Sequence, residues 1–261
     1  MRGSDYAAIA STLSAAVRDA GALALTTFQG ALRHWTKDRD SPVSEADLAV
    51  DALLKARLAM PGIGWLSEET EDDPARLAAR RVWVVDPIDG TRAYIAGLPD
   101  WTISAALVED GRPIVAALYA PVGNEFFLAI AGAGATCNGM AIQVTGEATL
   151  AGTRIAGPKR ALEELARHEP TLVIQPRVHS LALRLARVAQ GTFDAAFAGG
   201  NSHDWDLAAA DLLVHEAGGI LTTLAGESAI YNRPEPVHGP LIAAGRPRAR
   251  LLSDLLRSRL P

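Results

Sequence analysis

Residues 83–91 read Trp-Val-Val-Asp-Pro-Ile-Asp-Gly-Thr, an apolar run that leads directly into two carboxylates, a glycine and a hydroxyl. The run is rich in β-branched and aromatic residues and Pro87 opposes its continuation, so we expect Asp86 at the carboxyl end of a buried strand. Gly90 permits a tight bend, after which residues 91–95 can begin a short helix. An ordinary Asp-Pro turn is the simpler alternative. If the stretch is more than such a turn, it places carboxylates that can bind a cation beside backbone amides that can bind a phosphate.

Composition indicates a globular protein that can bury a large core. The chain has 261 residues, of which 49% are hydrophobic, and its formal net charge is -5. This charge and the lack of a long basic run argue against nucleic-acid binding and against an anionic membrane surface. The single cysteine, Cys137, excludes an internal disulfide and a cysteine-based zinc site and fits a reducing compartment. We therefore expect a cytoplasmic protein.

The N-terminal third predicts two helices and a short strand. Residues 7–25 follow helical spacing but carry two charges, which makes the segment too polar to span a bilayer. We interpret residues 29–42 as a mobile surface loop. A second helix opens at Ser44 and ends near residue 61, and a strand at residues 63–66 leads into Glu68 and Glu69.

The remainder divides into two patterns. From 102 to 144, short apolar runs separated by turns predict antiparallel hairpins. The pair of glycines at 132 and 134 lacks the third glycine of a dinucleotide loop. Beyond 145, helix and strand patterns alternate. We expect helices at 181–188, at 207–217 and in a terminal segment through 256, and strands at 193–198, 220–224 and 241–244. We expect two abutting subdomains, 1–144 and 145–261, with a site between them.

Several acidic residues follow strands or open helices. Each has a structural alternative: Asp47 can cap its helix, Asp206 can favour the positive end of its helix, and Glu68 or Glu69 can be a solvated surface charge. Two carboxylates about 4 Å apart repel by about 4 kcal/mol at an effective dielectric near 20, so their convergence would require a cation. Mg²⁺ prefers such oxygen ligands. The acids therefore predict a magnesium site, and its residues are Glu68, Asp86, Asp89, Asp206 and Asp47.

With these residues assembled, the chain resembles the inositol monophosphatase family of Mg²⁺-dependent, lithium-sensitive phosphatases. Residues 86–91 look like one family signature, and Trp205 to Ala210 with Glu216 to Gly219 look like the second. Residues 42–47 and 66–69 match upstream segments in the expected order. The resemblance spans roughly residues 5 to 245. It implies a layered αβαβα sandwich of the sugar-phosphatase type, with a mixed N-terminal sheet and a C-terminal α/β subdomain.

The resemblance also implies the roles of single residues. Two to three Mg²⁺ ions would be held by Glu68, Asp86, the Ile88 carbonyl, Asp89 and Asp206. Thr91 with Asp47 would orient and deprotonate the attacking water, with Glu68 assisting catalysis, and the Gly90 and Thr91 amides would hold the phosphate. On the substrate side we expect Arg92, Ser180, His203 and Lys37.

The predicted function is hydrolysis of a small phosphorylated metabolite. An inositol monophosphate-like polyol or sugar phosphate and a 3′(2′),5′-bisphosphate nucleotide are near equals, and histidinol phosphate is third. The segment from Gly199 to Asn201 lacks the acidic residue of inositol-specific members, and Arg92 could contact a second anionic group or form a surface ion pair. A non-catalytic regulatory protein on the same scaffold is the alternative of another class. Family relatives imply a homodimer, with no nucleic-acid or membrane partner.

Overall fold

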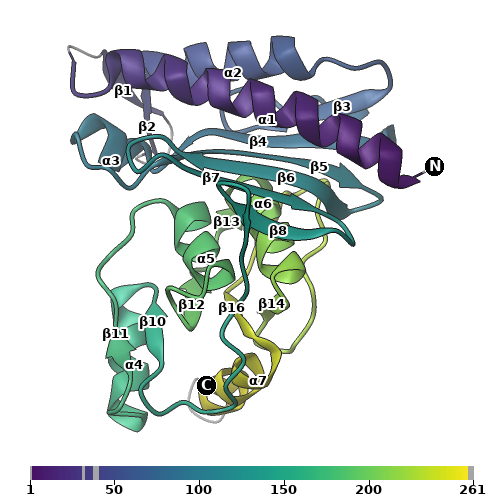
Figure 1. Cartoon of the computed structure of the whole chain (residues 1–261). Coiled ribbons are helices and arrows are strands. Elements are labelled where there is room, and N and C mark those ends of the chain that lie inside the picture. Colours follow the sequence, from purple (N-terminus) through teal and green to yellow (C-terminus); the bar gives the residue numbers. More distant parts are fainter. Residues whose placement is uncertain (1, 31–32, 38–40, 258–261) are drawn as a thin grey trace.

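The computed structural model describes residues 2–30, 33–37 and 41–257 as alternating layers of helices and sheets (Figure 1). One outer layer consists of α1 (Arg2–Thr27) and α2 (Glu45–Leu58). A seven-stranded sheet follows, then α5 (Leu181–Ala189) with α6 (Asp204–Glu216). A five-stranded sheet comes next, covered by α4 (Lys159–His168) and α7 (Arg246–Arg257). The predicted αβαβα sandwich is confirmed.

The larger sheet contains residues 83–89, which lie in its strand β4 (Arg81–Asp89). Its strand order is β3 (Ile63–Ser67), β4, β5 (Thr102–Glu109), β6 (Arg112–Ala120), β7 (Glu125–Ile130), β8 (Gly134–Cys137) and β9 (Met140–Ala141). Only β3 and β4 among these neighbours are parallel, and the later strands pair as the predicted antiparallel hairpins. The glycines at 132 and 134 lie at the turn between β7 and β8, both with positive φ.

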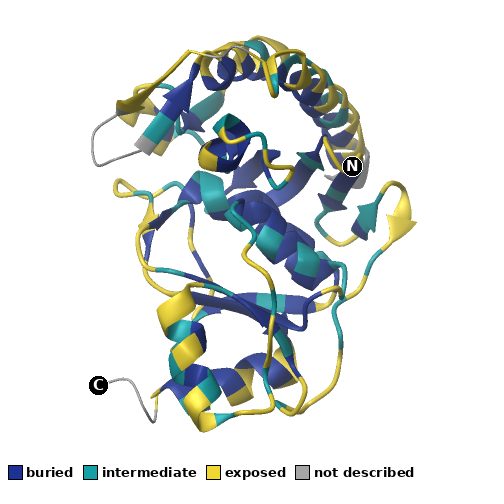
Figure 2. Ribbon diagram, turned by 90° about the vertical axis from the view of Figure 1, so that its left-hand side faces the viewer, coloured by how far each residue is buried: buried dark blue, intermediate teal, exposed yellow. Residues whose placement is uncertain are grey.

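Both faces of this sheet are covered, which explains its nearly continuous apolar sequence. Along β4, Val82 and Val84 join the core that contains α5 and α6. Trp83 and Val85 point to the opposite face and join the core beneath α1 and α2. Each such buried side chain contributes about 1.5–3 kcal/mol of hydrophobic stabilisation. Figure 2 shows the buried strands enclosed between helices whose exposed residues lie on their outward sides.

The smaller sheet lies in the second half of the chain. Its order is β11 (Val173–Ile174), β10 (Arg154–Ala156), β12 (Ala195–Ala198), β16 (Leu241–Gly245) and β14 (Gly219–Thr223). The helices and strands predicted beyond residue 180 are confirmed, whereas α4, β10 and β11 were not predicted. The two sheets fall on either side of residue 144, and the division into subdomains there stays a prediction.

The prediction of a loop at residues 29–42 is wrong for part of that segment. A two-stranded antiparallel sheet is formed by β1 (His34–Lys37) and β2 (Ser41–Ser44). Residues 31–32 and 38–40 lie outside the described residues. The hairpin was not predicted, because mixed charges conceal its strand pattern. Other short elements are the 3₁₀ helix η2 (Pro74–Ala78), α3 (Thr91–Ile95) and the pair β13 (Ser202–His203) and β15 (Val237–His238).

The expected end of β4 at Asp86 is also wrong. The strand continues through Pro87 to Asp89, and its pairing with β5 shifts register between Asp86 and Asp89. Proline is tolerated in a strand at such an irregularity, where no ladder hydrogen bond is required from its nitrogen. The short helix predicted from Thr91 does form, as α3.

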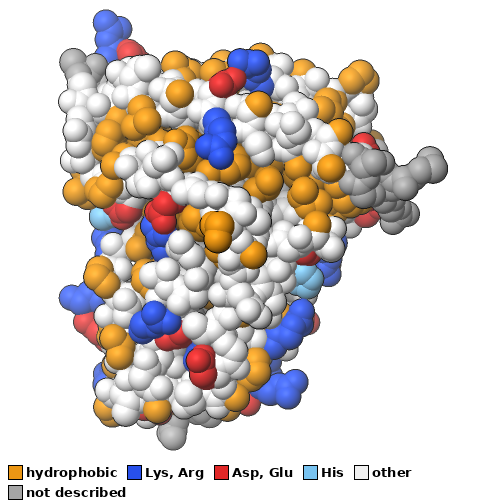
Figure 3. Space-filling view, viewed as in Figure 1, with side chains coloured by type: hydrophobic (Ala, Val, Ile, Leu, Met, Phe, Trp, Pro, Cys, Tyr) orange, Lys and Arg blue, Asp and Glu red, His pale blue; other side chains and the backbone are white. Residues whose placement is uncertain are grey.

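The helix predicted at residues 7–25 is confirmed as α1. The segment was expected to be too polar to span a bilayer, but by length and composition it is apolar enough. Its segment Asp5–Thr27 has the length and mean hydropathy of a candidate membrane span, 1.2 over its window. In the structure its apolar side, including Leu13 and Val17, packs in the core with α2 and the larger sheet. The apolar composition is therefore also that of a core helix. On the face in Figure 3, acidic and basic side chains are interspersed among apolar ones.

Candidate metal and phosphate site

The parallel pair of strands brings two acidic segments together. In the register of β3 and β4, Ser67 lies opposite Val85, so both strands end at the same edge of the sheet. Glu68 follows immediately, and its amide donates a hydrogen bond to the Val85 carbonyl at 3.3 Å. Asp86 comes next after Val85 on β4. Strand direction alone therefore places Glu68 beside the Asp86 to Asp89 segment.

The third acid comes from the helix layer beneath the larger sheet. Asp206 lies in the first turn of α6, and its Oδ2 accepts a hydrogen bond from the His203 amide at 2.7 Å. This reciprocal contact caps the helix and fixes the carboxylate in place, a role that was not predicted for Asp206. Asp206 then reaches across the layers to β4. Oxygen atoms of Asp86, Asp89 and Asp206 all lie within 4.8 Å of one another.

This convergence is electrostatically unfavourable for the protein alone. Burial, then the charges of Glu68 and the other acids, raises the pKa of Asp86 well above its ordinary value. Burial, and next the Asp89 charge, raises the pKa of Asp206 to about 7. Asp86 Oδ1 is also buried without a hydrogen-bond partner among the described residues. A buried, unsatisfied carboxylate oxygen is costly unless a cation or a proton compensates it.

The position of Asp89 is fixed by α5 from the second half of the chain. Its Oδ2 accepts hydrogen bonds from Ser180 Oγ and the Ala182 amide, both at 2.6 Å, and its Oδ1 accepts one from the Leu181 amide at 3.2 Å. Burial raises the pKa of Asp89, while these hydrogen bonds oppose the increase. Oδ2 accepts two hydrogen bonds, whereas Oδ1 accepts one and retains a lone pair for a cation. Ser180 is itself fully buried, so its hydroxyl is engaged with Asp89.

Gly90 provides the turn between the acids and α3. Its φ is 98°, a conformation that residues with a side chain rarely adopt. A Cβ at this position would lie 3.1 Å from the Asp100 carbonyl oxygen and 3.3 Å from the Ser180 amide nitrogen. The turn therefore needs glycine both for its backbone angle and because residues 100 and 180 approach closely.

Thr91 and Asp47 form a hydrogen-bonded pair beside this turn. Thr91 Oγ1 lies 3.1 Å from Asp47 Oδ1 and 3.0 Å from the Ile88 carbonyl oxygen, and can donate to either. Asp47 Oδ2 accepts from the Ser44 amide at 2.8 Å and from Ser44 Oγ at 2.5 Å. Burial raises the pKa of Asp47, and the hydrogen bonds from Ser44 and Thr91 counteract it. The predicted capping contact of Asp47 is thus confirmed and coexists with the contact to Thr91.

A cavity of about 330 Å³ opens over these groups, and we call it the acid cavity. It is lined by Pro42, Glu68, Asp86, Asp89, Gly90, Thr91, Arg92, Arg177, His179 and Asp206. Most of the residues predicted for catalysis or metal binding line it or contact one that does. The Ile88 side chain is fully buried, and its carbonyl oxygen meets the Thr91 hydroxyl.

The predicted substrate-side residues lie in less uniform positions. Arg92 lines the cavity, whereas Ser180 is outside the lining and donates a hydrogen bond to Asp89. His203 is outside the lining, and its ring stacks on Trp205 with the centroids 4.5 Å apart. The side chain of Lys37 lies outside the described residues. Gly199 and Asn201 are likewise absent from the lining.

Three residues of the lining were not predicted for the site; one is Pro42, and the two basic ones are Arg177 and His179. These two precede α5 in a segment without repeated pattern, and no motif distinguishes them in the sequence. The signal that could have indicated them is their short distance before Ser180, which caps α5 by accepting the Leu183 amide hydrogen bond at 2.9 Å. His179 is held by Asp100, whose Oδ2 lies 2.7 Å from its Nδ1.

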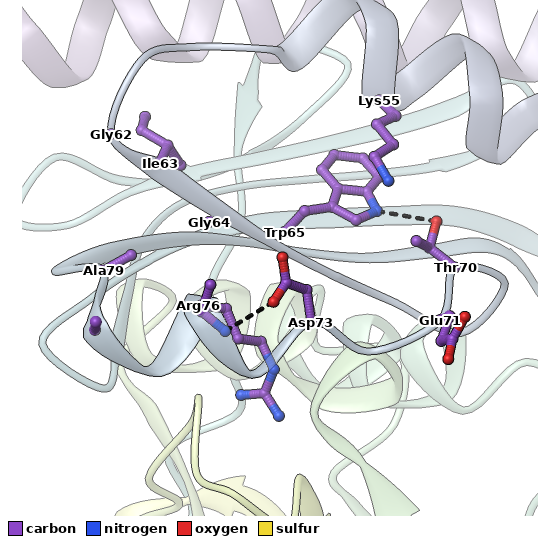
Figure 4. A pocket seen from close by; sticks show the side chains of 12 residues that line it. Lys55, Gly62, Ile63, Gly64, Trp65, Thr70, Glu71, Asp73, Arg76 and Ala79 are labelled. Atoms are coloured by element: carbon purple, nitrogen blue, oxygen red, sulfur yellow. Dashed lines mark hydrogen bonds between the residues drawn. The ribbon is translucent and has the colours of Figure 1, made fainter.

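A larger cavity, of about 600 Å³, lies elsewhere, beside β3 and η2 (Figure 4). Trp65 and Lys55 line it, and the Trp65 indole donates to Thr70 at 3.3 Å. Its acidic residues, Glu71 and Asp73, do not belong to the carboxylate cluster of the acid cavity. The chemistry of the side chains, not cavity size, identifies the candidate site.

Comparison with known proteins agrees with the geometry of the site. The model of the inositol monophosphatase family matches residues 5–259. The chain is 37% identical over 204 residues to the Nus factor SuhB of Xylella fastidiosa, covering 74% of this chain and 73% of that protein. It is 35% identical over 208 residues to the histidinol-phosphatase of Mycobacterium tuberculosis, covering 75% and 79%. The IMPase structure of Thermotoga maritima superposes with a TM-score of 0.82 at 26% identity, covering 100% and 98% of the two chains.

Proposed function

Because this chain belongs to the inositol monophosphatase family and is a phosphoric monoester hydrolase, we propose that it hydrolyses a small phosphorylated metabolite with Mg²⁺ and an activated water. One observation supports this proposal most directly. Asp86, Asp89 and Asp206 converge within 4.8 Å, and an oxygen of Asp86 is buried without a hydrogen bond among the described residues. A cation between the carboxylates would remove their repulsion and satisfy the unpaired oxygen.

The donor atoms suit magnesium. All are oxygens, from Glu68, Asp86, Asp89, Asp206 and the Ile88 carbonyl, and hard cations such as Mg²⁺ prefer oxygen ligands. We assign Glu68, Asp86 and Ile88 to a first ion, Asp86, Asp89 and Asp206 to a second, and Glu68 to a third, weaker ion. Bound there, the ions would acidify water and stabilise the charge of the leaving oxygen.

The chain's own groups would position the water. The ionised Asp47 draws the Thr91 hydroxyl hydrogen toward itself, since Oγ1 and Oδ1 are 3.1 Å apart. The Thr91 oxygen then keeps a lone pair that can accept a hydrogen bond from a water. Because burial raises the pKa of Asp47, its carboxylate is a better proton acceptor than an exposed aspartate. Thr91 would orient the water, and the proton would pass through Thr91 to Asp47.

The phosphate would lie against the turn between Asp89 and α3. Gly90 leaves room for close approach, and we assign the Gly90 and Thr91 amides to the phosphate oxygens. Attack in line with the leaving alkoxide needs no covalent phosphoenzyme. Glu68 lines the same cavity and would help to hold the reacting groups in place.

We propose three classes of substrate. An inositol monophosphate-like polyol or sugar phosphate and a 3′(2′),5′-bisphosphate nucleotide are the leading classes, and the similarity to a histidinol-phosphatase favours histidinol phosphate as the alternative. The similarity to a Nus factor favours a regulatory role on the same scaffold as a candidate of another class. On the family resemblance and the single cysteine we also propose a homodimeric, cytoplasmic enzyme that Li⁺ inhibits.

The test is phosphate release by the purified chain from a panel of phosphate esters. We expect hydrolysis in Mg²⁺, suppression by Li⁺, and a loss of at least about 100-fold in kcat for Asp89→Asn, because one carboxylate ligand and its charge are removed. Asp19→Asn, at an exposed position on α1, serves as the matched control. Undiminished hydrolysis in EDTA would overturn the metal-dependent mechanism. Metal binding without turnover of any ester would support the regulatory candidate.

A further inference from the structure

The acid cavity has a second wall of opposite charge. Glu68, Asp86, Asp89 and Asp206 form its acidic part, whereas Arg92, Arg177 and His179 contribute basic side chains. The acids are accounted for by the proposed metal ions. The phosphate itself has been assigned to those ions and to the amides at Gly90 and Thr91. The basic side chains are therefore the charged lining groups that remain to meet the rest of the ester.

Arg177 differs from other exposed arginines without an ion pair by lining the acid cavity. It is exposed, and within residues 2–30, 33–37 and 41–257 it has neither a hydrogen bond nor an ion pair. Arg160, Arg246 and Arg250 are also exposed and have no ion pair within the described residues, but they do not line this cavity. By contrast, Arg76, Arg154 and Arg187 each form an ion pair with a carboxylate. After burial and the opposing effect of Asp89, the charge of Arg177 contributes to the lowered pKa of Arg184, so the two cations lie near one another. A bound anion would relieve that repulsion.

The backbone that carries Arg177 is held at several points. The His179 amide donates to Asp100 Oδ2 at 2.5 Å, and the Ser180 amide donates to the Asp100 carbonyl at 3.2 Å. On the residue between, the Val178 carbonyl accepts a hydrogen bond from Arg184 Nη2 at 2.8 Å. Because its base is fixed, Arg177 loses less freedom when it binds a ligand than a residue in an unanchored loop would.

We infer that the substrate is a phosphate monoester whose alcohol part carries a second anionic group, and that Arg177 binds this group. A guanidinium can donate two parallel hydrogen bonds to a phosphate or a carboxylate, the two groups that share the required geometry. The inference rests on the proposed hydrolase function and adds its specificity. It disfavours esters with a neutral polyol or a cationic amino group at that end, because Arg177 would then stay unpaired or face a like charge.

The experiment compares two pairs of esters that differ by one anionic group. Adenosine 3′,5′-bisphosphate is paired with adenosine 3′-monophosphate, and 3-phosphoglycerate with glycerol 1-phosphate. For the wild-type chain in Mg²⁺ we expect a kcat/KM about 10- to 100-fold higher for the doubly charged member of at least one pair. Preference in the first pair indicates a phosphate, and preference in the second a carboxylate.

Variants then identify the residue responsible. Arg177→Gln should raise KM for the preferred ester about 10-fold or more, with kcat little changed and the poorer ester unaffected. Arg177→Lys should restore part of the preference, because it keeps the charge and loses the paired donors. Arg160→Gln, an exposed arginine of α4, is the matched control and should behave as wild type.

A binding measurement separates this inference from the proposed function. Calorimetry on Asp47→Asn protein, with and without Arg177→Gln, gives the Kd of the doubly charged esters without requiring turnover. A weaker Kd in the double variant, by about 10-fold, supports the inference even if no ester is hydrolysed. Hydrolysis by wild type with no preference in either pair, or an unchanged Kd on Arg177→Gln, overturns it and leaves the phosphatase proposal intact.

Discussion

Replacing Asp206 by Asn should make the metal-free protein more stable at neutral pH. The folded protein holds the pKa of Asp206 at about 7, above the ordinary 3.8, because of burial and the charge of Asp89. A raised carboxyl pKa means that the folded state binds the proton more tightly than the unfolded chain. Wild-type stability should therefore be unimpaired below pH 4 and fall as pH rises toward 7.

The magnitude follows from the size of this shift. A shift of about three units corresponds to about 4 kcal/mol at full effect. The Asp206 side chain is, however, 21% exposed, and solvent screens part of the penalty, so we expect about 2 kcal/mol. The asparagine carbonyl can still accept the His203 amide hydrogen bond, so the helix cap is retained.

The assay is urea unfolding between pH 5 and 8, in EDTA and in Mg²⁺. In EDTA at pH 7.5, Asp206→Asn should exceed wild type by about 2 kcal/mol, and the difference should shrink toward pH 5. In Mg²⁺ at about 100 times its Kd, wild type should gain about 2.7 kcal/mol and the variant much less. Asp211→Asn, at a buried aspartate of α6 that accepts a hydrogen bond from Tyr231 instead, is the control and should keep the Mg²⁺ gain.

Two results would refute this reasoning. One is an Asp206→Asn protein that is less stable than wild type in EDTA at pH 7.5, which would mean that the carboxylate is not strained by its neighbours. The other is a variant that retains the full stabilisation by Mg²⁺, which would mean that Asp206 does not hold a cation.

Further predictions concern the turn, the water-positioning pair and the second sheet. Gly90→Ala should lower the free energy of unfolding by about 2–3 kcal/mol, because residue 90 has a positive φ and its Cβ would approach the Asp100 carbonyl. An unchanged Tm in thermal unfolding would contradict this prediction. Thr91→Val should lower kcat at least about 100-fold with little change in Mg²⁺ affinity; equal loss of metal binding would argue for a structural role. Burial would raise the pKa of Asp194, but hydrogen bonds led by Arg154 lower it to about 2. This depressed pKa stabilises the fold above pH 4, and the stabilisation is lost as pH falls through 2. Since Arg154 is half exposed, Asp194→Asn should cost about 1–2 kcal/mol of unfolding free energy at pH 7, and this cost should shrink as pH falls toward 2.

The sequence could predict the parts of the molecule that depend on local pattern. Apolar periodicity predicted α1, α2, α5 and α6 and the hairpins of the larger sheet, because burial on one or both faces leaves a regular trace. The β1–β2 hairpin escaped because the described side chains of β1, His34, Trp35 and Thr36, are all exposed and leave no apolar alternation. The course of β4 through Pro87 escaped because a register shift removes the rule against proline.

The candidate site shows the same division. Asp86, Asp89 and Asp206 were predicted from strand ends, helix starts and family motifs, and the structure brings them together. Arg177 and His179 were not predicted, because their position depends on Asp100, which lies almost 80 residues earlier in the chain. Contacts between segments so distant in sequence leave no local pattern.

The hydrogen bonds between Asp89 and the start of α5 have a consequence for folding kinetics. Asp89 belongs to the larger sheet, whereas Ser180 and Ala182 come from the second half of the chain. The site cannot be complete until these distant segments have docked, and contacts of long sequence separation form slowly. In refolding experiments, recovery of Mg²⁺ binding should therefore lag behind recovery of helical circular dichroism, which would make the metal a reporter of the last assembly step.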